Sequence, residues 1–190
     1  MPDSATVNVR LPDGSRREVP RGATVRAILQ EWRPQESATF LAATLDGAPV
    51  DLDRHVEKDS LLAPLTFEDR AGRDILQHSA AHLVAKALTE VIPGAKPTHG
   101  PPTDEGFFYD FDVRPLTPED LEEMRRAMGR TVRAKDPFSR REISKPEAEE
   151  MFAANPHKLR YIHEVPEGES VSVYSTGDFV DLCRGPHVPD

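Results

Sequence analysis

The stretch Asp74-Ile-Leu-Gln-His78-Ser-Ala-Ala-His82-Leu-Val-Ala-Lys-Ala-Leu88 decides how the chain is organised. Its apolar residues recur at the spacing of one helix face, and they are Leu76, Ala80, Leu83, Val84, Ala87 and Val91. At about 100° per residue, His78 and His82 fall on the opposite side of this predicted helix. Small residues accompany them there, namely Ser79, Ala81 and Ala85. Because a core histidine belongs within the apolar stripe, we interpret the histidine side as a functional site.

A second motif is Asp181-Leu-Cys183-Arg-Gly-Pro-His187. With 7 histidines in 190 residues, a His-x-x-x-His pair arises by chance in about one sequence in four. A histidine four residues after the single cysteine arises in roughly one sequence in twenty-five. Gly185-Pro186 predicts a turn that lets the thiol and the last imidazole face one way. Two imidazoles one helical turn apart could meet this pair, and such a group could hold zinc or orient a water and a substrate.

Length, charge and cysteine content limit the class of protein. A chain of 190 residues suits one medium domain or two small ones. The net charge of -9 argues against broad binding to a nucleic-acid backbone, although a few placed contacts could still read an RNA end. One cysteine excludes an intramolecular disulfide and is typical of a reducing cytoplasm. The first residues lack signal-peptide features and no run is long enough to span a membrane, so we expect a soluble intracellular protein.

The first third of the chain predicts a small sheet with one helix. In chain order, the predicted elements are a strand over 5–11, a turn over 12–15, a strand over 16–19, a helix capped by Thr24 with Val25, Ile28 and Leu29 inward, a strand over 39–45, a turn at 46–47 and a last strand from Leu61. This order suggests a β-grasp module of the ubiquitin type. It lacks any cluster of catalytic residue types, so we expect a docking or RNA-contacting accessory domain.

The charged segment Glu68–Arg73 predicts a linker, and the domain boundary is placed there. In chain order, the elements expected after it are the histidine helix ending at Pro93-Gly94, a turn at Gly100-Pro101, a strand over 107–112 with Phe107 and Phe111 in the core, a helix capped by Thr117 with Leu121, Met124, Met128 and Val132 inside, a strand over 138–143, a short helix with a capping box at 144–147, strands over 158–165 and 170–176, and Phe179-Val180 leading into the cysteine motif. This mixture predicts an α+β sandwich.

The most basic stretch lies on the helix that Thr117 opens, and it comprises Arg125, Arg126, Arg130, Arg133 and Lys135. We favour a solvated helix face, and a contact to an RNA backbone is the alternative.

These motifs resemble the N-terminal region of bacterial threonyl-tRNA synthetase. The resemblance rests on His78-x-x-x-His82, on Gly100-Pro101 with Gly106-Phe-Phe-Tyr109-Asp, and on Cys183-Arg-Gly-Pro-His187. It covers essentially the whole chain. Residues 1–66 resemble the TGS domain, a β-grasp fold, and residues 68–190 resemble the tRNA-editing domain, an α/β sandwich. The Cys-Arg-Gly-Pro-His segment is the most specific element, because the related alanyl-type editing proteins keep the spacing with different residues inside.

The resemblance implies post-transfer editing, which is hydrolysis of mischarged Ser-tRNA(Thr). A missing methyl group is worth only about 1–3 kcal/mol of discrimination, so a second site that admits serine and excludes threonine is needed. The resemblance implies that a pocket lined by His78, His82, Cys183 and His187 holds the terminal adenosine and the seryl group. A water held with Lys158 and Asp181 would attack the ester, Lys158 near the developing oxyanion, and Tyr109 and Gly100 would contact substrate. For Lys158, an ordinary surface lysine is the equal alternative.

Zinc is an open choice within the resemblance. The alanyl relatives use the quartet His78, His82, Cys183 and His187 as zinc ligands, whereas the bacterial threonyl editing site works without metal. Three imidazoles and a thiolate would close a four-ligand site and leave no position for water. We therefore expect no cofactor for editing, and any metal would use these four residues.

The implied partners are the acceptor end of tRNA(Thr) with its seryl ester and the remainder of the synthetase, which carries the catalytic and anticodon-binding domains. No segment resembles the ATP-binding motifs, and the family's editing domain normally continues past His187, so we expect a fragment of a cytoplasmic enzyme whose editing domain could be incomplete. The fragment is expected to be a monomer and the full enzyme a homodimer. The alternatives are a free-standing trans-editing hydrolase of alanyl- or seryl-tRNA, which generally lacks a TGS domain, and a non-catalytic tRNA- or zinc-binding module.

Overall fold

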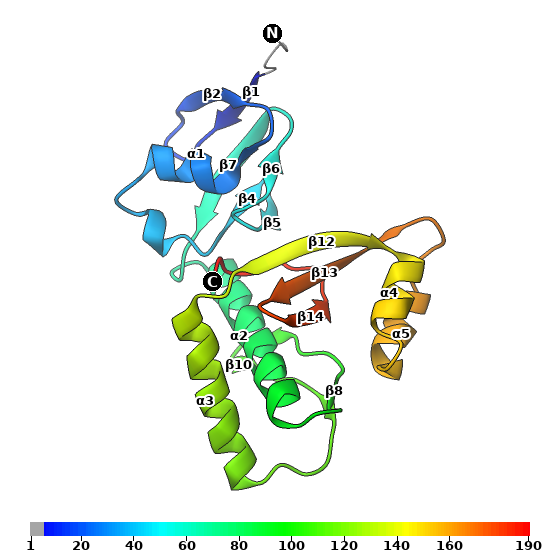
Figure 1. Ribbon diagram of the computed structural model, residues 1–190. Coiled ribbons are helices and arrows are strands. Elements are labelled where there is room, and N and C mark those ends of the chain that lie inside the picture. Colours follow the sequence, from blue (N-terminus) through cyan, green and yellow to red (C-terminus); the bar gives the residue numbers. More distant parts are fainter. Residues whose placement is uncertain (1–5) are drawn as a thin grey trace. The chain divides into compact units, whose positions relative to one another are not determined.

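The computed structural model describes residues 6–190, which form two compact units (Figure 1). One unit contains the chain up to Leu76 together with Gly185–Pro189, and the other contains Gln77–Arg184 with Asp190. The boundary between residues 66 and 68 stays a prediction. Ala5, which begins the first predicted strand, and the other residues before Thr6 lie outside the described part. Among residues 6–190, no helix combines the length and the apolar character that crossing a bilayer requires.

The first unit is built on a five-stranded mixed sheet in the order β2-β1-β7-β4-β5 (Figure 1). Strand β1 pairs antiparallel with β2 and parallel with β7. The elements are β1 (Thr6–Arg10), β2 (Arg16–Pro20), β3 (Ala23–Thr24), α1 (Val25–Trp32), the 3₁₀ helix η1 (Ser37–Thr39), β4 (Ala42–Leu45), β5 (Ala48–Val50), β6 (His55–Val56) and β7 (Ser60–Leu65). The core joins apolar residues of α1 to those of the sheet.

Local chemistry explains these elements and confirms most of those predicted for this unit. Val7 and Val9 are buried on alternate positions of β1. The side chain of Thr24 accepts a hydrogen bond from the N–H of Ala27 and caps α1. The predicted strand from Thr39 is wrong in its first residues, because η1 ends at Thr39 and β4 begins only at Ala42. The hydroxyl of Thr39 donates to the carbonyl of Glu36, a local bond that competes with sheet pairing.

The predicted linker is wrong from Arg70 onward, because helix α2 (Arg70–Val91) begins there. The carboxylate of Asp69 accepts from the N–H and the hydroxyl of Thr66, and the guanidinium of Arg73 donates to the carbonyls of Phe67 and Glu68. The charged side chains therefore form local hydrogen bonds that fix the start of the helix, and the segment is not an extended loop.

The histidine face of α2 is its most deeply buried face, which contradicts the expectation that the apolar stripe is the core. Ser79 and His82 are 3% and 4% exposed, whereas Leu76 of the stripe is 36% exposed. Ala87 of the stripe does pack against helix α3 (Pro118–Ala134), in a cluster with Leu88, Met124 and Ala127. The helix is thus buried on more than one side, and periodicity alone cannot rank two buried faces.

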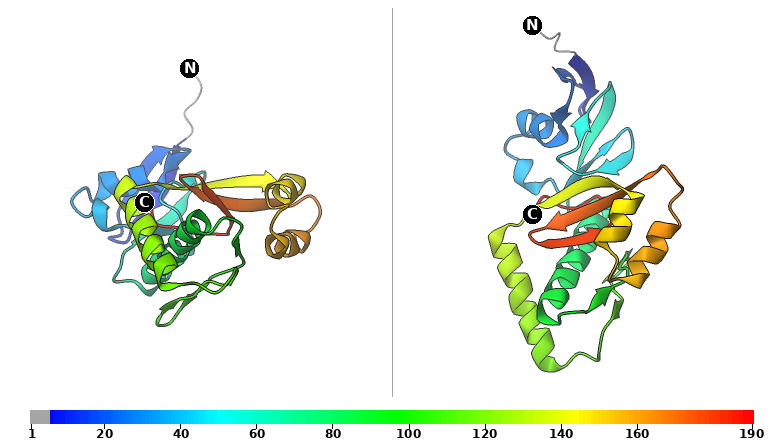
Figure 2. Two further views of the ribbon diagram at one scale, coloured as in Figure 1. Left: turned by 60° about the horizontal axis from the view of Figure 1, so that its bottom comes forward. Right: turned by 45° about the vertical axis from the view of Figure 1, so that its right-hand side comes forward.

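In the second unit, α2 and α3 lie side by side, next to an antiparallel sheet in the order β12-β13-β14 (Figures 1 and 2). The remaining elements are β8 (Lys96–Pro97), β9 (Pro102–Thr103), β10 (Gly106–Phe107), β11 (Phe111–Asp112), β12 (Phe138–Ser144), α4 (Lys145–Met151), α5 (Pro156–His163), β13 (Ser170–Thr176) and β14 (Phe179–Leu182). This arrangement agrees with the predicted α+β class. The strands expected near 138–143 and 170–176 are confirmed, and Ser144 caps α4 through the N–H of Glu147.

Two predicted strands of this unit are wrong. Residues 158–165 fall mostly in helix α5, which Asn155 caps through the N–H groups of His157 and Lys158, with Pro156 in the first turn. The strand expected over 107–112 is broken, because β10 pairs with β9 and β11 pairs with β8. Phe107 and Phe111 are both half-buried, and Phe111 packs against the core cluster that contains Leu88 and Met124.

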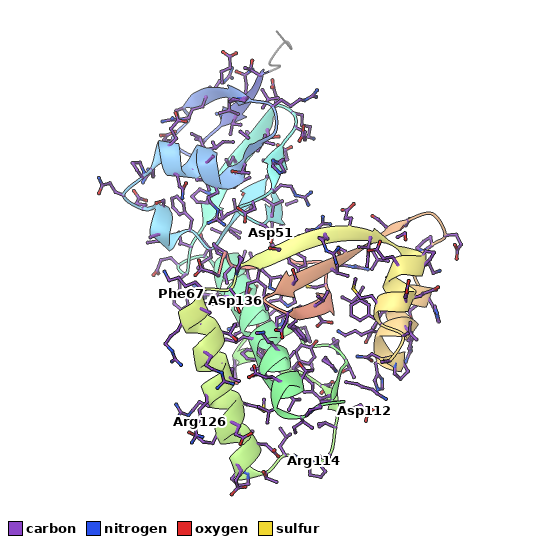
Figure 3. All side chains as sticks on the ribbon, in the orientation of Figure 1. Asp51, Phe67, Asp112, Arg114, Arg126 and Asp136 are labelled. Carbon is purple, nitrogen blue, oxygen red and sulfur yellow. The ribbon has the colours of Figure 1, made fainter. Side chains whose placement is uncertain are left out.

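Helix α3 starts as predicted, with a reciprocal capping box between Thr117 and Asp120. Its expected interior is wrong at two positions, since Leu121 and Val132 are 55% and 62% exposed. Arg126 lies on the side of α3 away from α2 (Figure 3). The basic side chains Arg125 and Arg126 pair with Glu122, and Arg130 pairs with Glu90, all on the surface. These pairs favour the solvated-face interpretation.

Candidate functional site

The site of the second unit centres on two histidines of α2 and the cysteine that follows β14. The Nε2 atom of His78 lies 3.0 Å from the Sγ atom of Cys183. The rings of His78 and His82 meet edge to face with centroids 5.0 Å apart. The structure therefore brings together side chains that are about a hundred residues apart in the sequence, as predicted.

The β13–β14 hairpin positions the cysteine. Tyr174 is paired with Asp181 and Val173 with Leu182, and the ladder continues beyond β14 because the N–H of Cys183 donates to the carbonyl of Ser172 at 3.2 Å. The hydroxyl of Ser172 returns a bond to the carbonyl of Cys183 at 2.6 Å. Asp181 and Cys183 are two residues apart on an extended segment, so their side chains project to the same side.

Asp181 anchors a buried polar network beside the histidines. Its carboxylate lies 2.7 Å from the Nζ of Lys158, and it accepts from the phenol of Tyr109 at 2.6 Å and the N–H of Leu182 at 2.8 Å. The ammonium of Lys158 also donates to the Tyr109 oxygen at 3.4 Å. Lys158 is only 3% exposed, so the interpretation of an ordinary surface lysine is wrong. It comes from the first turn of α5 and not from a strand.

Burial sets the protonation states in this cluster. Burial lowers the pKa of His82 to about 4, against the opposing attraction of Asp181, so its imidazole is neutral at neutral pH. Burial also lowers the pKa of His78, and Asp181 again opposes the shift. Burial and then the Asp181 charge raise the pKa of Tyr109, so its phenol keeps its proton and donates. The site thus combines neutral imidazoles, which can accept a proton, with a fixed ammonium.

Gly100 has a packing role that its position in a turn did not predict. A Cβ atom added there would lie 2.5 Å from the ring of Tyr109 and 2.5 Å from the carbonyl oxygen of Phe108. A side chain at this position would therefore displace Tyr109, whose ring stacks on Phe111 with centroids 4.6 Å apart. A direct contact of Gly100 or Tyr109 with substrate stays a prediction.

His187 lies in the segment Gly185–Pro189, which groups with the first unit. There the backbone N–H of His187 donates to a carboxylate oxygen of Asp51 at 2.9 Å, and the His187 side chain is buried. That His187 completes the group of His78, His82 and Cys183 stays a prediction.

The donor set of the second unit is compatible with zinc. His78, His82 and Cys183 each offer a ligand atom, and these atoms lie within 4.8 Å of one another. Imidazole nitrogen and thiolate sulfur are the ligands that zinc prefers, and the low pKa of His82 keeps it in the neutral form that binds a metal. Metal-free action stays a prediction.

Sequence reasoning missed the residues that enclose His82. The rings of Phe138 and Phe179 each pack edge-on against it, with centroids 6.4 Å away. Lys86, one helical turn further along α2, places its Nζ 2.5 Å from a carboxylate oxygen of Asp178. This bond ties the β13–β14 turn to α2. The spacing of four residues from His82 was the available signal for Lys86.

Comparisons with known proteins find similar sequences along nearly the whole chain. A domain family described as "Threonyl and Alanyl tRNA synthetase second additional domain" matches residues 171–190, which contain β14, the cysteine motif and all of β13 except Ser170. Threonine–tRNA ligase of Symbiobacterium thermophilum is 44% identical over 189 residues. The corresponding ligases of Burkholderia lata and Syntrophomonas wolfei are 41% and 38% identical over 186 residues.

These alignments cover 98%, 96% and 96% of this chain but only 29% of each relative. The chain therefore spans somewhat less than a third of the length of the curated relatives it matches.

Proposed function

Because the chain is related to the N-terminal region of bacterial threonine–tRNA ligases, we propose that it edits mischarged tRNA by hydrolysing the ester of Ser-tRNA(Thr). The observation that carries this proposal is the buried cluster of His78, His82 and Cys183 beside the Lys158–Asp181 pair. A neutral imidazole can act as the general base in ester hydrolysis, and a fixed cation can stabilise the oxyanion that develops on the carbonyl.

In the proposed reaction, a water bound near His78 and His82 attacks the carbonyl carbon of the seryl ester. One neutral imidazole accepts a proton from the water as the new C–O bond forms. The ammonium of Lys158 stabilises the negative charge that develops on the carbonyl oxygen. The C–O bond to the ribose then breaks, and the ribose oxygen takes the proton from the imidazolium. Free serine and tRNA with an intact 3′ end result.

Asp181 and Tyr109 position the reacting groups in this scheme. The carboxylate of Asp181 holds Lys158 at 2.7 Å, and the phenol of Tyr109 donates to the same carboxylate at 2.6 Å. The seryl amine, a cation at neutral pH, would find its counter-charge at Asp181 as well. Cys183 contacts His78 at 3.0 Å and fixes the orientation of that imidazole.

Selectivity for serine would come from the size of the pocket. A single methyl group changes the binding free energy by only about 1–3 kcal/mol. This difference is too small for an acylation site to exclude serine. A second site that rejects the larger threonyl ester by contact with its methyl group supplies the remaining discrimination.

His187 would complete the pocket as a third imidazole, since only three residues separate it from Cys183. We propose that hydrolysis needs no metal. If zinc were bound, His78, His82, Cys183 and His187 would hold it, and it would polarise the ester carbonyl as a Lewis acid only if one of these ligands left its position. A closed set of four protein ligands leaves no position for water, which favours the metal-free scheme.

The first unit would be a TGS domain of β-grasp fold. A mixed five-stranded sheet with a parallel β1–β7 pair and helix α1 packed on its core supports this proposal. Its role would be docking, either to tRNA or to the remainder of a cytoplasmic, homodimeric synthetase. The acceptor end of tRNA(Thr) would be the substrate-bearing partner.

Deacylation of charged tRNA(Thr) tests the proposal. Ser-tRNA(Thr) labelled in the seryl group should lose its label much faster with this chain than in buffer, and Thr-tRNA(Thr) should stay charged. If the seryl ester is lost no faster than in buffer while tRNA binding persists, the chain is a non-catalytic binding module. If Ala-tRNA is cleaved in preference, the chain is an alanyl-type editor.

A further inference from the structure

Three exposed rings gather on the surface of the second unit. The ring of His99 meets Phe108 with centroids 5.9 Å apart and Tyr161 with centroids 6.5 Å apart. Phe108 is 45% and Tyr161 41% exposed, and His99 is also exposed. We call His99, Phe108 and Tyr161 the aromatic cluster. Two large aromatic side chains that stay this exposed while touching a common neighbour contribute little to a core.

Each member of the aromatic cluster is close in sequence to a residue of the buried network or, for His99, to Gly100, which packs against Tyr109 of that network. His99 directly precedes Gly100, and Phe108 directly precedes Tyr109. Tyr161 follows Lys158 by three residues in α5, so the two project from the same helix face. The segments that build the interior of the site therefore also place one ring each on the adjoining surface.

Backbone and side-chain bonds hold these segments together. The N–H of Asp110 donates to the carbonyl of His99 at 3.0 Å, which fixes the two loops that carry His99 and Phe108. The side-chain amide of Asn155 donates to the carbonyl of Pro97 at 2.8 Å, which fixes the start of α5 to β8. The aromatic cluster is thus held in place before any ligand binds, which lowers the entropic cost of binding a flat group.

We infer that the aromatic cluster is a stacking platform for an unpaired base of the tRNA 3′ end. This inference rests on the proposed function, because an ester delivered to His78 and Lys158 brings the single-stranded acceptor end past the neighbouring surface. Unpaired bases are bound by stacking on exposed aromatic side chains, and stacking needs no excess of positive charge. A chain of net charge -9 can therefore hold an RNA end in this way.

Binding of a labelled RNA hairpin tests the inference. One hairpin carries the single-stranded 3′ end of tRNA(Thr), and a second keeps the same phosphates but has abasic residues in that end. The wild-type chain should bind the first hairpin roughly tenfold more tightly than the second. Phe108→Ala with Tyr161→Ala should reduce binding of the first to the level of the second. Phe108→Trp should retain tight binding, because a larger ring still stacks.

A matched control and a kinetic readout separate stacking from damage to the fold. Phe67 is also exposed, at 58%, but lies outside the aromatic cluster, so Phe67→Ala should change neither binding nor hydrolysis. In deacylation of Ser-tRNA(Thr), the double variant should raise KM and leave kcat nearly unchanged. Tyr161→Leu serves as a second variant if the double variant melts at a lower temperature than wild type.

The outcomes distinguish this inference from the proposed function. If the wild-type chain hydrolyses Ser-tRNA(Thr) and the double variant binds the intact hairpin as tightly as wild type, the stacking platform is wrong and the editing proposal stands. Equal weakening on intact and abasic hairpins also overturns the platform. If binding depends on the bases and on Phe108 but no ester is cleaved, the platform holds and the editing proposal fails.

Discussion

The Nζ of Lys158 lies 2.7 Å from a carboxylate oxygen of Asp181, and the two side chains are 4% and 3% exposed. An ion pair taken this far from water is stable only when further hydrogen bonds satisfy its members. Tyr109 and the N–H of Leu182 supply those bonds to Asp181. The pair joins α5 to β14. It therefore also fixes the position of the Lys158 ammonium relative to Cys183, which directly follows β14.

Breaking this pair should destabilise the fold strongly. Asp181→Asn leaves the ammonium of Lys158 buried without a counter-charge, and we expect a loss of about 3–5 kcal/mol in the free energy of unfolding. Glu31→Gln is the matched control, because the Arg17–Glu31 pair is exposed and is worth about 1 kcal/mol or less. Urea denaturation of both variants gives the two values. Similar small losses for both would show that the Lys158–Asp181 pair is not buried in solution.

Acid should weaken the fold through His82. Its pKa is lowered to about 4 in the folded chain, from 6.5 in the unfolded one, so the unfolded state binds a proton first as the pH falls. The folded state is therefore destabilised through His82 as the pH falls from 6.5 to 4. When the pH is lowered from about 7.5 to 5.5, this single group should reduce the free energy of unfolding by roughly 1 kcal/mol.

Urea denaturation of wild type and His82→Gln at these two pH values measures the effect. The difference in stability between the pH values should be smaller in the variant by roughly 1 kcal/mol. An equal pH dependence in both proteins would mean that His82 is accessible to water and protonates normally.

Alanine substitutions at two glycines should have opposite effects on the stability of the fold. Gly100→Ala places a Cβ 2.5 Å from the ring of Tyr109, so the ring must move, and both stability and hydrolysis should fall. Gly129→Ala lies within α3, where the Cβ meets only the flexible end of Arg133 at 3.2 Å. That change should stabilise the helix by about 0.5–1 kcal/mol. Thermal melting of the two variants checks the prediction, and a tolerated Gly100→Ala would remove the packing argument for Tyr109.

Hydrolysis should not require a metal. We expect chain dialysed against a chelator to contain far less than one zinc per molecule and to keep its deacylation rate. Elemental analysis of the purified chain, with the rate measured on the same sample, is the measurement. One zinc per chain that disappears together with activity in His82→Ala would overturn the metal-free scheme and make the quartet a metal centre.

The sequence predicted the site better than the surroundings that build it. The spacing of four residues indicated that His78 and His82 share one helix face, because helical periodicity is a local property, whereas the resemblance to a known family implied that Cys183 lies beside them. The network at Lys158 was less accessible, since its segment was taken for a strand. Asn155 and Pro156 carried the helix-start signal, and the apolar residues after them outweighed it in the prediction.

Burial was the weakest part of the prediction, and α2 and α3 show why. Ala81 and Ala85 are fully buried although alanine adds little to a hydrophobic stripe, while Leu121 and Val132 of α3 are exposed. Small residues are buried where two segments approach closely, and that depends on the partner segment. Single-sequence periodicity reports only which residues share a face, not which face meets a partner.

The central claim is that this chain cleaves a seryl ester with the cluster around His78. The most direct measurement compares the rates at which wild type and His78→Ala release serine from Ser-tRNA(Thr), with Thr-tRNA(Thr) as the second substrate. The wild-type chain should release serine while sparing threonine, and His78→Ala should be slower by roughly 10²–10⁴-fold, the usual contribution of a general base. Equal rates for wild type and variant, or equal loss of both amino acids, would contradict the account.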